Sequence, residues 1–453
     1  MYGSGQRGAG LFSAGSVYLA AKTLENKRQM GWEAMSYIAN RPGDKRSNAY
    51  RDLSYDDLKE LHDKSMRDLE ASRRVTEERR RGVSLLDGVG PSGSEFRRAV
   101  YDEILFRDPM TNGNTTPMPH GCVAMQGERS DFYRGERSMH KKSVPTLARA
   151  LDQLTSPDDR LLYRLVAEMR IAEFDIFIHA FDRLKQWEDR DLTILTEPLA
   201  QHYGLETDWL DITNDFDTAL FFATCRWDNG KKKWFPLTRD DTERPGKEQY
   251  RYGVIFHAPA GPSKVFSMGQ YFTSGSDEGM VLPLGYQPFL RCQSQYGYAM
   301  HMTKPVPLQK NLTFEKLRFL HSEKLSREVY ERMGKGKKVY PDEGLSAFFD
   351  VIDAIVSATE FSEEAFAAVL EKNGLAARGA ELRAALEAFR PVIDKRIRGP
   401  FHIGGNTYLS QVPQERIREA NQADADYSIE KANGIQPGTR PVFYTIGEER
   451  EHE

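Results

Sequence analysis

The chain has 453 residues, 39% of them hydrophobic and 29% charged, and its formal net charge is −4 at pH 7. That length exceeds the size of one simple hydrophobic core, so we expect two or three domains. The near balance of charges excludes an overall positive field, and any contact with nucleic acid must therefore come from a local basic patch.

The cysteines and the N-terminal segment indicate the cellular compartment of the protein. Cys122, Cys225 and Cys292 stand far apart and form neither a zinc-ligand pattern nor a disulfide framework. Residues 1–22 hold a small apolar patch but lack the long apolar core of a signal peptide or a membrane span. We therefore expect a cytoplasmic protein with no membrane contact and no metal site.

Helical patterns dominate the N-terminal region. Helix formers fill residues 16–40, and Ser54 precedes a segment in which leucines recur at helical spacing as far as Arg81. The arginines at 73–81 fit a solvated helix face better than an RNA-binding patch, because acidic residues are interleaved and aromatic residues are absent. The Gly, Pro and Ser content of residues 84–96 is typical of a linker.

A candidate anion-binding strand follows at Asp131–Glu136, which reads DFYRGE. Arg134 comes after two aromatic residues, and Gly135 then permits close approach by another backbone or by a ligand. Two interpretations stay open. Arg134 is an anion clamp, or it is a strand-end arginine paired with a carboxylate such as Asp211.

The stretch Leu199–Cys225 joins a turn, a short strand and an apolar helix. His202 and Tyr203 stand before Gly204, which suits a tight turn. Residues 207–212 alternate as a strand, and Thr213 or Asn214 is predicted to cap the next helix. The plain interpretation is a capped core helix with a satisfied histidine beside it. The functional interpretation is a cluster of binding groups on a rigid strand-to-helix junction.

The remaining segments complete an α+β pattern. A long helix is predicted over 156–187, a surface insertion over 228–250 and a buried strand over 252–257. Short strands with turns are expected over 276–303. Further helices are predicted over residues 317–332, 340–355, 362–373 and 379–390.

Several blocks taken together resemble the FRG domain, a bacterial and phage family named for a Phe-Arg-Gly signature. The signature stands here as Phe132-Tyr133-Arg134-Gly135, and VPTLAR at 144–149 is similar to the next block. LAQHYGLETDWLD, followed by TALFFA, is very similar to the most recognisable segment of the family. Two later motifs of the family also have counterparts here. The first is similar to Arg291, Gln295 and Gly297, and the second is similar to Tyr340-Pro341-Asp342.

The resemblance covers residues 96–352 and divides the chain. We expect a helical N-terminal extension (1–95), an FRG domain core (96–352, with an insertion near 228–250), a helical C-terminal region (353–398) and an irregular tail (399–453).

The block order of this family is similar to that of ADP-ribosyltransferases, which implies a fold and a reaction. The implied fold is α+β, with a split, mainly antiparallel sheet core flanked by N- and C-terminal helical extensions. The implied function is an NAD-dependent ADP-ribosyltransferase of the kind that serves as a bacterial toxin or an anti-phage effector. NAD is then a substrate.

That analogy also implies an NAD-binding set. Arg134 grips phosphate or ribose, while Tyr203 and Phe221 stack the nicotinamide ring. The full set is Arg134, Gly135, Tyr203, Thr213 and Phe221.

The implied catalytic set is His202, Asp211 and Gln295. His202 donates to a ribose hydroxyl or a phosphate, and Gln295 orients the ribose 2′-hydroxyl. Because a carboxamide cannot act as a general base, that role falls to Asp211, to Glu278 or to the chemistry of the acceptor.

The acceptor and the partners stay open. The acceptor is RNA, DNA or a protein, and the helical extensions are either structural buttresses or a surface for an antitoxin or regulator. The alternative function is a non-enzymatic module that binds a nucleotide or nucleic acid in the same cleft. The amide at Gln295, in place of a catalytic carboxylate, supports that alternative.

Overall fold

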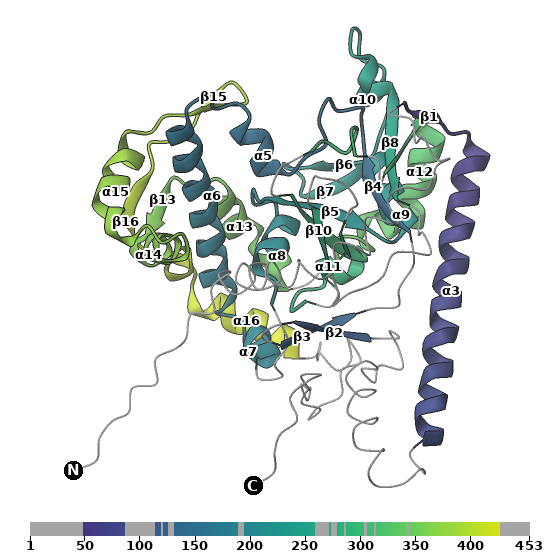
Figure 1. Cartoon of the computed structure of the whole chain (residues 1–453), viewed down its shortest axis with the longest axis horizontal. Helices are drawn as coiled ribbons and strands as arrows, with labels where there is room; N and C mark the ends of the chain where they lie inside the picture. Colours follow the sequence, from purple (N-terminus) through teal and green to yellow (C-terminus); the bar gives the residue numbers. More distant parts are fainter. Residues whose placement is uncertain are drawn as a thin grey trace, which may run out of the picture.

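The computed structural model in Figure 1 describes residues 49–86, 114–118, 121–125, 131–188, 194–258, 271–272, 279–284, 287–302, 306–311, 314–341 and 344–425. The helix predicted over 16–40 lies outside these residues, as do Glu278 and Asp342.

A sheet of eight described strands organises the fold, in the spatial order β1-β12-β8-β4-β5-β11-β10-β9. Neighbours among these strands run antiparallel, except that β1 runs parallel to β12. The predicted α+β class with a mainly antiparallel sheet is confirmed. The strands are β1 (Arg51–Asp52), β4 (Phe132–Glu136), β5 (Trp209–Thr213), β8 (Tyr252–Ala258), β9 (Tyr271–Phe272), β10 (Gly279–Pro283), β11 (Gly297–Met302) and β12 (Glu315–Leu320). A separate hairpin joins β2 (Asn114–Met118) to β3 (Gly121–Met125).

The sheet is nearly divided between β4 and β5. Strand β4 pairs with β8 along its whole length, whereas in the described structure it pairs with β5 only through Tyr133 and Thr213. We call this junction the seam. Backbone groups of β5 beyond that single pair need other partners, because buried carbonyl and amide groups are costly to leave unpaired.

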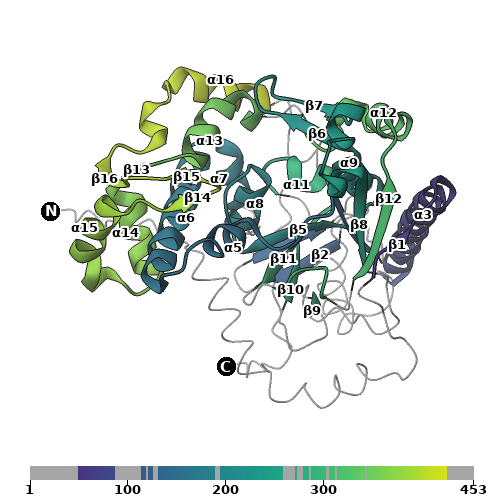
Figure 2. The ribbon, with the colours of Figure 1, turned by 90° about the horizontal axis from the view of Figure 1, so that it is seen from above.

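Helices cover both faces of the sheet (Figure 2). Phe132 packs with α6 (Pro157–Ile178) and α7 (Asp182–Glu188) on one face. Tyr133 packs with α9 (Phe216–Thr224) and α12 (Glu323–Arg332) on the other. This alternation is that of a strand buried on both sides. The face with α6 also carries α8 (Thr196–His202), α11 (Arg291–Ser294), the 3-10 helix η4 (Gly344–Phe348) and α13 (Phe349–Val356).

The helix after β5 begins one residue later than predicted. Asp215 is its N-cap, and its carboxylate accepts a hydrogen bond from the backbone N–H of Thr218 at 2.9 Å. Thr213 remains in β5, and Asn214 lies between strand and cap. The single-sequence pattern cannot separate these neighbours, because each of the three residue types is a good cap.

The predicted insertion at 228–250 is not a surface loop. Strands β6 (Cys225–Asp228) and β7 (Lys233–Pro236) form a hairpin, which α10 (Arg239–Thr242) and the 3-10 helix η2 (Glu248–Arg251) follow. Trp227 and Trp234 meet with ring centroids 5.6 Å apart, and both contact Tyr340. The aromatic side chains therefore anchor the hairpin.

The helix predicted over 317–332 is wrong in its first part. Residues 315–320 form β12, and Ser322 caps α12 by accepting from the backbone N–H of Leu325 at 3.1 Å. The buried Leu317 and Phe319 alternate with Arg318, which is the pattern of a strand rather than a helix.

Residues 358–405 form a lobe around α6. Strand β13 (Glu360–Ser362), α14 (Glu363–Lys372), α15 (Gly379–Ala388) and β16 (His402–Gly405) share a core cluster with α6. The buried Glu173 of α6 accepts from the backbone N–H of Ser362 at 2.7 Å. A short hairpin pairs β14 (Val392–Ile393) with β15 (Arg396–Ile397), and single 3-10 turns lie at η3 (Gly334–Gly336), η5 (Ala376–Arg378) and η6 (Tyr408–Gln411).

The predicted irregular tail at 399–453 is wrong as far as residue 425. Strand β16 and α16 (Gln414–Ala425) are regular, and Ile417 and Ala420 of α16 are buried in the main core. These two apolar residues are spaced three apart among charged neighbours, a signal too short to predict a helix by itself. Residues 426–453 lie outside the described structure.

Helix α3 (Tyr55–Leu86) confirms the helix predicted after Ser54. The backbone N–H of Ser54 donates to the Asp57 carboxylate at 2.7 Å, as in a helix-capping turn. Lys64 and His62 then attach the helix to the core, at 2.7 Å from Asp131 and 2.9 Å from Asp217. Helix α3 stands at the edge of the sheet next to β1 (Figure 1).

Candidate functional site

Arg134 bridges the seam. Its Nη1 donates to the backbone carbonyl of Asp211 at 2.6 Å, and its Nε donates to Glu136 at 3.0 Å. The guanidinium thus satisfies a carbonyl of β5 that has no partner on β4. Nη2 makes no hydrogen bond within the described residues, and the side chain is 23% exposed. The sequence left open whether Arg134 binds an anion or pairs with a carboxylate. In the structure it pairs with the carboxylate of Glu136, and Asp211 contributes its backbone carbonyl rather than its carboxylate.

The carboxylate of Glu136 is itself fixed. Ser143 Oγ donates to it at 2.6 Å, and Gln309 holds Ser143 through bonds of 2.9 Å to the backbone N–H and 2.8 Å to Oγ. Glu136 is buried, so these donors supply the polar contacts that water would otherwise provide. The orientation of Arg134 is therefore set by a chain of three further side chains.

His202 and Asp211 face each other at the other side of the seam. His202 Nε2 lies 3.5 Å from Asp211 Oδ1, and neither atom has a hydrogen-bond partner within the described residues. The histidine side chain is 2% exposed and the aspartate side chain 34% exposed. A buried imidazole therefore faces a carboxylate whose side chain is partly open to solvent.

Gln295 fixes the tautomer of His202. Its carboxamide nitrogen donates to the carbonyl of Val339 at 2.9 Å, which turns its oxygen toward His202 Nδ1 at 3.0 Å. A carboxamide oxygen only accepts, so Nδ1 carries a proton. Nε2 is then the ring nitrogen without that proton, and it faces Asp211 at 3.5 Å.

The end of β5 is tied to the same segment. Thr213 Oγ1 donates to the backbone carbonyl of Gln295 at 2.7 Å and accepts from the backbone N–H of Asp215 at 2.9 Å. The residue predicted to bind NAD is thus a buried tie between β5 and the turn after α11. Gln295 is the C-cap residue of α11 and lies just before β11.

Arg291 is a functional candidate that sequence reasoning named only as part of a motif. Its guanidinium carbon lies 3.9 Å from the ring centroid of Tyr203 and 3.4 Å from that of Tyr340. Nη1 donates to the carbonyl of His202 at 2.8 Å. The side chain is buried, and stacking on two aromatic rings offsets part of the cost of burying its charge. Arg291 therefore holds the backbone of His202, and its guanidinium covers the ring of Tyr203.

Two residues of the predicted NAD-binding set lie in the packed core. A Cβ built on Gly135 would stand 1.7 Å from the carbonyl oxygen of Ala219, so this glycine admits the backbone of α9. Phe221 is fully buried in the cluster on the α9 face, against Phe222 and Trp234. Tyr203 belongs to the cluster on the opposite face. Phe221 and Tyr203 are thus not brought together.

Arg149 adds a second cation near the seam. It lies on α5 (Thr146–Leu151), is exposed, and its side chain donates no hydrogen bond within the described residues. Burial lowers the pKa of Arg149, and the neighbouring charge of Arg134 lowers it further. The two positive charges repel each other, and an anion bound between them would remove that repulsion. The VPTLAR block was the sequence signal for this residue.

A groove lies away from the seam, and the described part of the chain shows neither a metal-site arrangement nor a membrane-spanning helix. An open groove of about 510 Å³ lies between the start of α6 and the end of α15, and none of the seam residues lines it. No group of His, Cys, Asp and Glu among the described residues has the arrangement of a metal site. No helix in that part of the chain combines the length and apolarity that crossing a membrane requires.

Comparison with known families gives one match. Residues 129–232 match the family model of the FRG domain, a stretch that contains Arg134, His202 and Asp211 and ends before Gln295. The match is shorter than the 96–352 resemblance predicted from sequence. Neither a curated protein nor a solved structure matches the chain.

Proposed function

We propose that this chain, which contains an FRG domain, is an NAD-dependent ADP-ribosyltransferase with its active site at the seam. The observation that carries the proposal is the connected line Arg134–Asp211–His202–Gln295 across the seam, with contacts of 2.6, 3.5 and 3.0 Å between successive groups. These residues are separated by up to 161 positions in sequence but meet where the sheet is nearly split.

The arginines and the Asp211–His202 pair take different parts in the proposed reaction. The reaction breaks the bond between ribose C1′ and the nicotinamide nitrogen, which leaves with the electron pair through a transition state of oxocarbenium character. The acceptor then bonds to C1′ and releases a proton. Arg134, with its unpaired Nη2, and Arg149 bind the NAD phosphates. Asp211 and Nε2 of His202 take the acceptor proton.

Gln295 acts on His202 and not on the ribose in this scheme. Both ends of its carboxamide are engaged, one by His202 and the other by Val339, and the residue is buried. It is therefore a positioning residue. The carboxamide of Gln295 therefore need not act as a general base, because the Asp211–His202 pair takes that role.

Release of nicotinamide from NAD tests the proposal. We expect the Asp211→Asn variant, which keeps the shape but loses the charge, to slow release by about 10²- to 10⁴-fold. Arg134→Lys should mainly raise KM for NAD, because lysine lacks the forked donors of arginine. Asp350→Asn, which removes an exposed carboxylate paired with Arg416, is the matched control and should stay within about twofold.

Two outcomes would overturn the proposal. One is wild-type release by Asp211→Asn. The other is the absence of release by the wild-type chain with every class of acceptor. A rise in Tm with nucleotides or RNA in that second case would favour the non-enzymatic binding module.

A further inference from the structure

Cations and aromatic rings alternate on the surface of the β6–β7 hairpin and the segment after it. The guanidinium of Arg226 lies 5.6 Å and the ammonium of Lys231 5.1 Å from the ring centroid of Phe235. Arg244 lies 5.2 Å from the centroid of Tyr250. We call this area the basic insertion surface; its residues are Arg137, Arg226, Lys231, Phe235, Arg244 and Tyr250.

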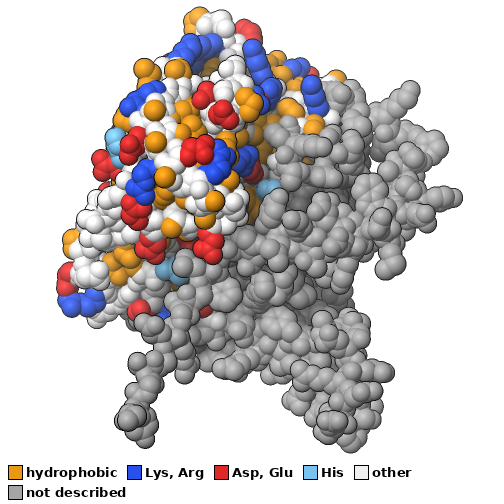
Figure 3. All heavy atoms as spheres, turned by 60° about the vertical axis from the view of Figure 1, so that its left-hand side comes forward, with side chains coloured by type: hydrophobic (Ala, Val, Ile, Leu, Met, Phe, Trp, Pro, Cys, Tyr) orange, Lys and Arg blue, Asp and Glu red, His pale blue; other side chains and the backbone are white. Residues whose placement is uncertain are grey.

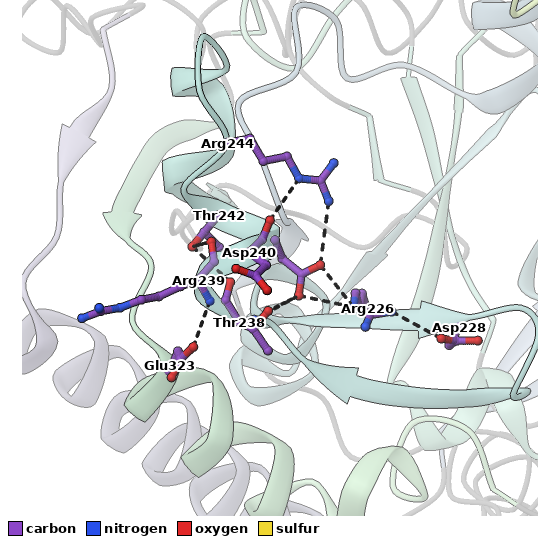
Figure 4. Close-up of polar contacts among 9 residues, drawn as sticks. Arg226, Asp228, Thr238, Arg239, Asp240, Thr242, Arg244 and Glu323 are labelled. Carbon is purple, nitrogen blue, oxygen red and sulfur yellow. Dashed lines mark hydrogen bonds and ion pairs between the residues drawn. The ribbon is translucent and has the colours of Figure 1, made fainter.

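Two carboxylates contact the cations, and one of them, Asp228, lies 3.5 Å from Arg226 (Figure 4). Asp241 accepts from Thr238 through the backbone N–H at 3.0 Å and through Oγ1 at 2.9 Å, which fixes it at the start of α10. Arg226 Nε lies 3.3 Å and Arg244 Nη2 3.8 Å from the same carboxylate. The two guanidinium groups are thus held in place by a rigid helix start.

The carboxylates do not neutralise this surface. Residues 226–251 contain eight Lys or Arg against five Asp or Glu, in a chain whose net charge is −4. Burial lowers the pKa of Arg137; Asp241 opposes that change, and the charges of Arg226 and Arg244 add to it. The charges of these three guanidinium groups therefore act on one another, and a local positive field exists where the whole chain has none.

The basic insertion surface continues to the seam. Arg137 directly follows β4, three residues after Arg134. Burial lowers the pKa of His140; Glu136 opposes this, and the charges of Arg149, Arg134 and Arg137 lower it further. Cations of the seam and of the insertion thus act on one imidazole. Helices α5 and α10 lie at the same end of the molecule in Figure 1, where Lys and Arg side chains also gather in Figure 3.

We propose that the basic insertion surface binds single-stranded nucleic acid and leads it to the seam as the acceptor. Phosphates meet Arg226, Lys231 and Arg244, and unpaired bases stack on Phe235 and Tyr250. A duplex does not expose base faces for such stacking, and an acidic protein surface gives the rings no partner. The binding stands on the geometry alone, whereas the acceptor role rests on the proposed transferase function.

Fluorescence anisotropy with a labelled oligonucleotide of about 20 nucleotides tests the binding without NAD. The arms are single-stranded DNA, single-stranded RNA, the matching duplexes and polyglutamate as competitor. We expect Lys231→Glu/Arg244→Glu to weaken binding at least tenfold and to reduce the salt slope by about 1.4, since each lost contact with a single strand removes about 0.7. Tyr250→Ala should weaken binding at least about fivefold.

A matched variant separates the surface from net charge. Lys395→Glu/Arg418→Glu changes the charge equally in the C-terminal lobe and on α16, and should bind like the wild type. Equal binding by the two charge-reversed variants would overturn the inference, as would duplex or polyglutamate binding as tight as that of single strands. Oligonucleotide binding without nicotinamide release would leave this binding intact and refute the transferase. Nicotinamide release without oligonucleotide binding would support the transferase and refute the binding of nucleic acid by this surface.

Discussion

At the scale of single residues, the contact between Gln295 and His202 decides which imidazole nitrogen faces Asp211. Gln295 Oε1 accepts a hydrogen bond from His202 Nδ1 at 3.0 Å, its Nε2 donates to the carbonyl of Val339 at 2.9 Å, and the residue is buried. A buried polar group that loses its hydrogen-bond partner lowers the free energy of unfolding.

We therefore expect Gln295→Ala to lower the free energy of unfolding by about 1–3 kcal/mol, because it leaves His202 Nδ1 and the Val339 carbonyl without partners. Urea unfolding measures the change. Gln411→Ala removes an exposed carboxamide that donates no hydrogen bond within the described residues, and should change the free energy by less than about 0.5 kcal/mol. A loss as small as that of the control would show that the carboxamide does not hold His202.

Part of the candidate site could be predicted from residue types alone. Arg134 after two aromatic residues and His202 before a tight turn were identifiable, because a guanidinium and an imidazole are unusual in apolar surroundings. The engagement of Gln295 by Val339 was not identifiable, since no local pattern shows which backbone carbonyl lies opposite. The stacking of Arg291 between Tyr203 and Tyr340 depends likewise on segments far apart in sequence.

At the scale of elements, α9 lies directly on β4. The carbonyl of Ala219 would stand 1.7 Å from a Cβ at residue 135, so a side chain there forces helix and strand apart. We expect Gly135→Ala to lower the free energy of unfolding by at least about 3 kcal/mol, the upper range for overpacking. Thermal or urea unfolding of the variant measures this effect.

Gly230→Ala is the matched control for that substitution. A Cβ at Gly230 meets its nearest atom, in the Asp228 side chain, at 3.5 Å, which is an ordinary contact. The control should unfold like the wild type. If Gly135→Ala did the same, the close approach of α9 to β4 would be refuted.

Elements with strong local signals were predictable, and elements that depend on distant contacts were not. Helix α14 began after Ser362 as predicted, because a serine cap and an acidic first turn precede its apolar positions. The β6–β7 hairpin was missed because its lysines read as a polar loop. Its order depends on Trp227 and Trp234 meeting Tyr340, more than a hundred residues away.

At the scale of the whole molecule, α3, β4, β8 and β12 meet at one charged cluster. His257 contacts Asp131 at 2.9 Å and Glu315 at 3.3 Å, and Lys64 of α3 contacts Asp131 at 2.7 Å. Burial alone would lower the pKa of His257, but the hydrogen bonds that the ring donates to the carboxylates of Asp131 and Glu315 outweigh it and raise the pKa above 6.5.

This raised pKa predicts a pH dependence of stability. A histidine with a raised folded pKa contributes stability that is complete below the unfolded value of about 6.5 and is lost as pH rises through the folded pKa. As pH rises above about 6.5, we expect the free energy of unfolding to fall more steeply in the wild type than in His257→Gln.

The comparison of variants isolates His257 from the other histidines. Burial lowers the pKa of His140, His301 and His321, so their contributions are lost as pH falls and not as it rises. His402→Gln changes an exposed histidine and should keep the wild-type slope. A wild-type slope in His257→Gln would contradict the role assigned to the Asp131–His257–Glu315 contacts.

A crystal structure of the chain with a non-hydrolysable NAD analogue tests whether the seam is the active site. We expect pyrophosphate oxygens within about 3 Å of the Arg134 guanidinium, with ribose C1′ facing the pair formed by Asp211 and His202. An analogue bound away from the seam, or a seam left unaltered at saturating analogue, would contradict the account.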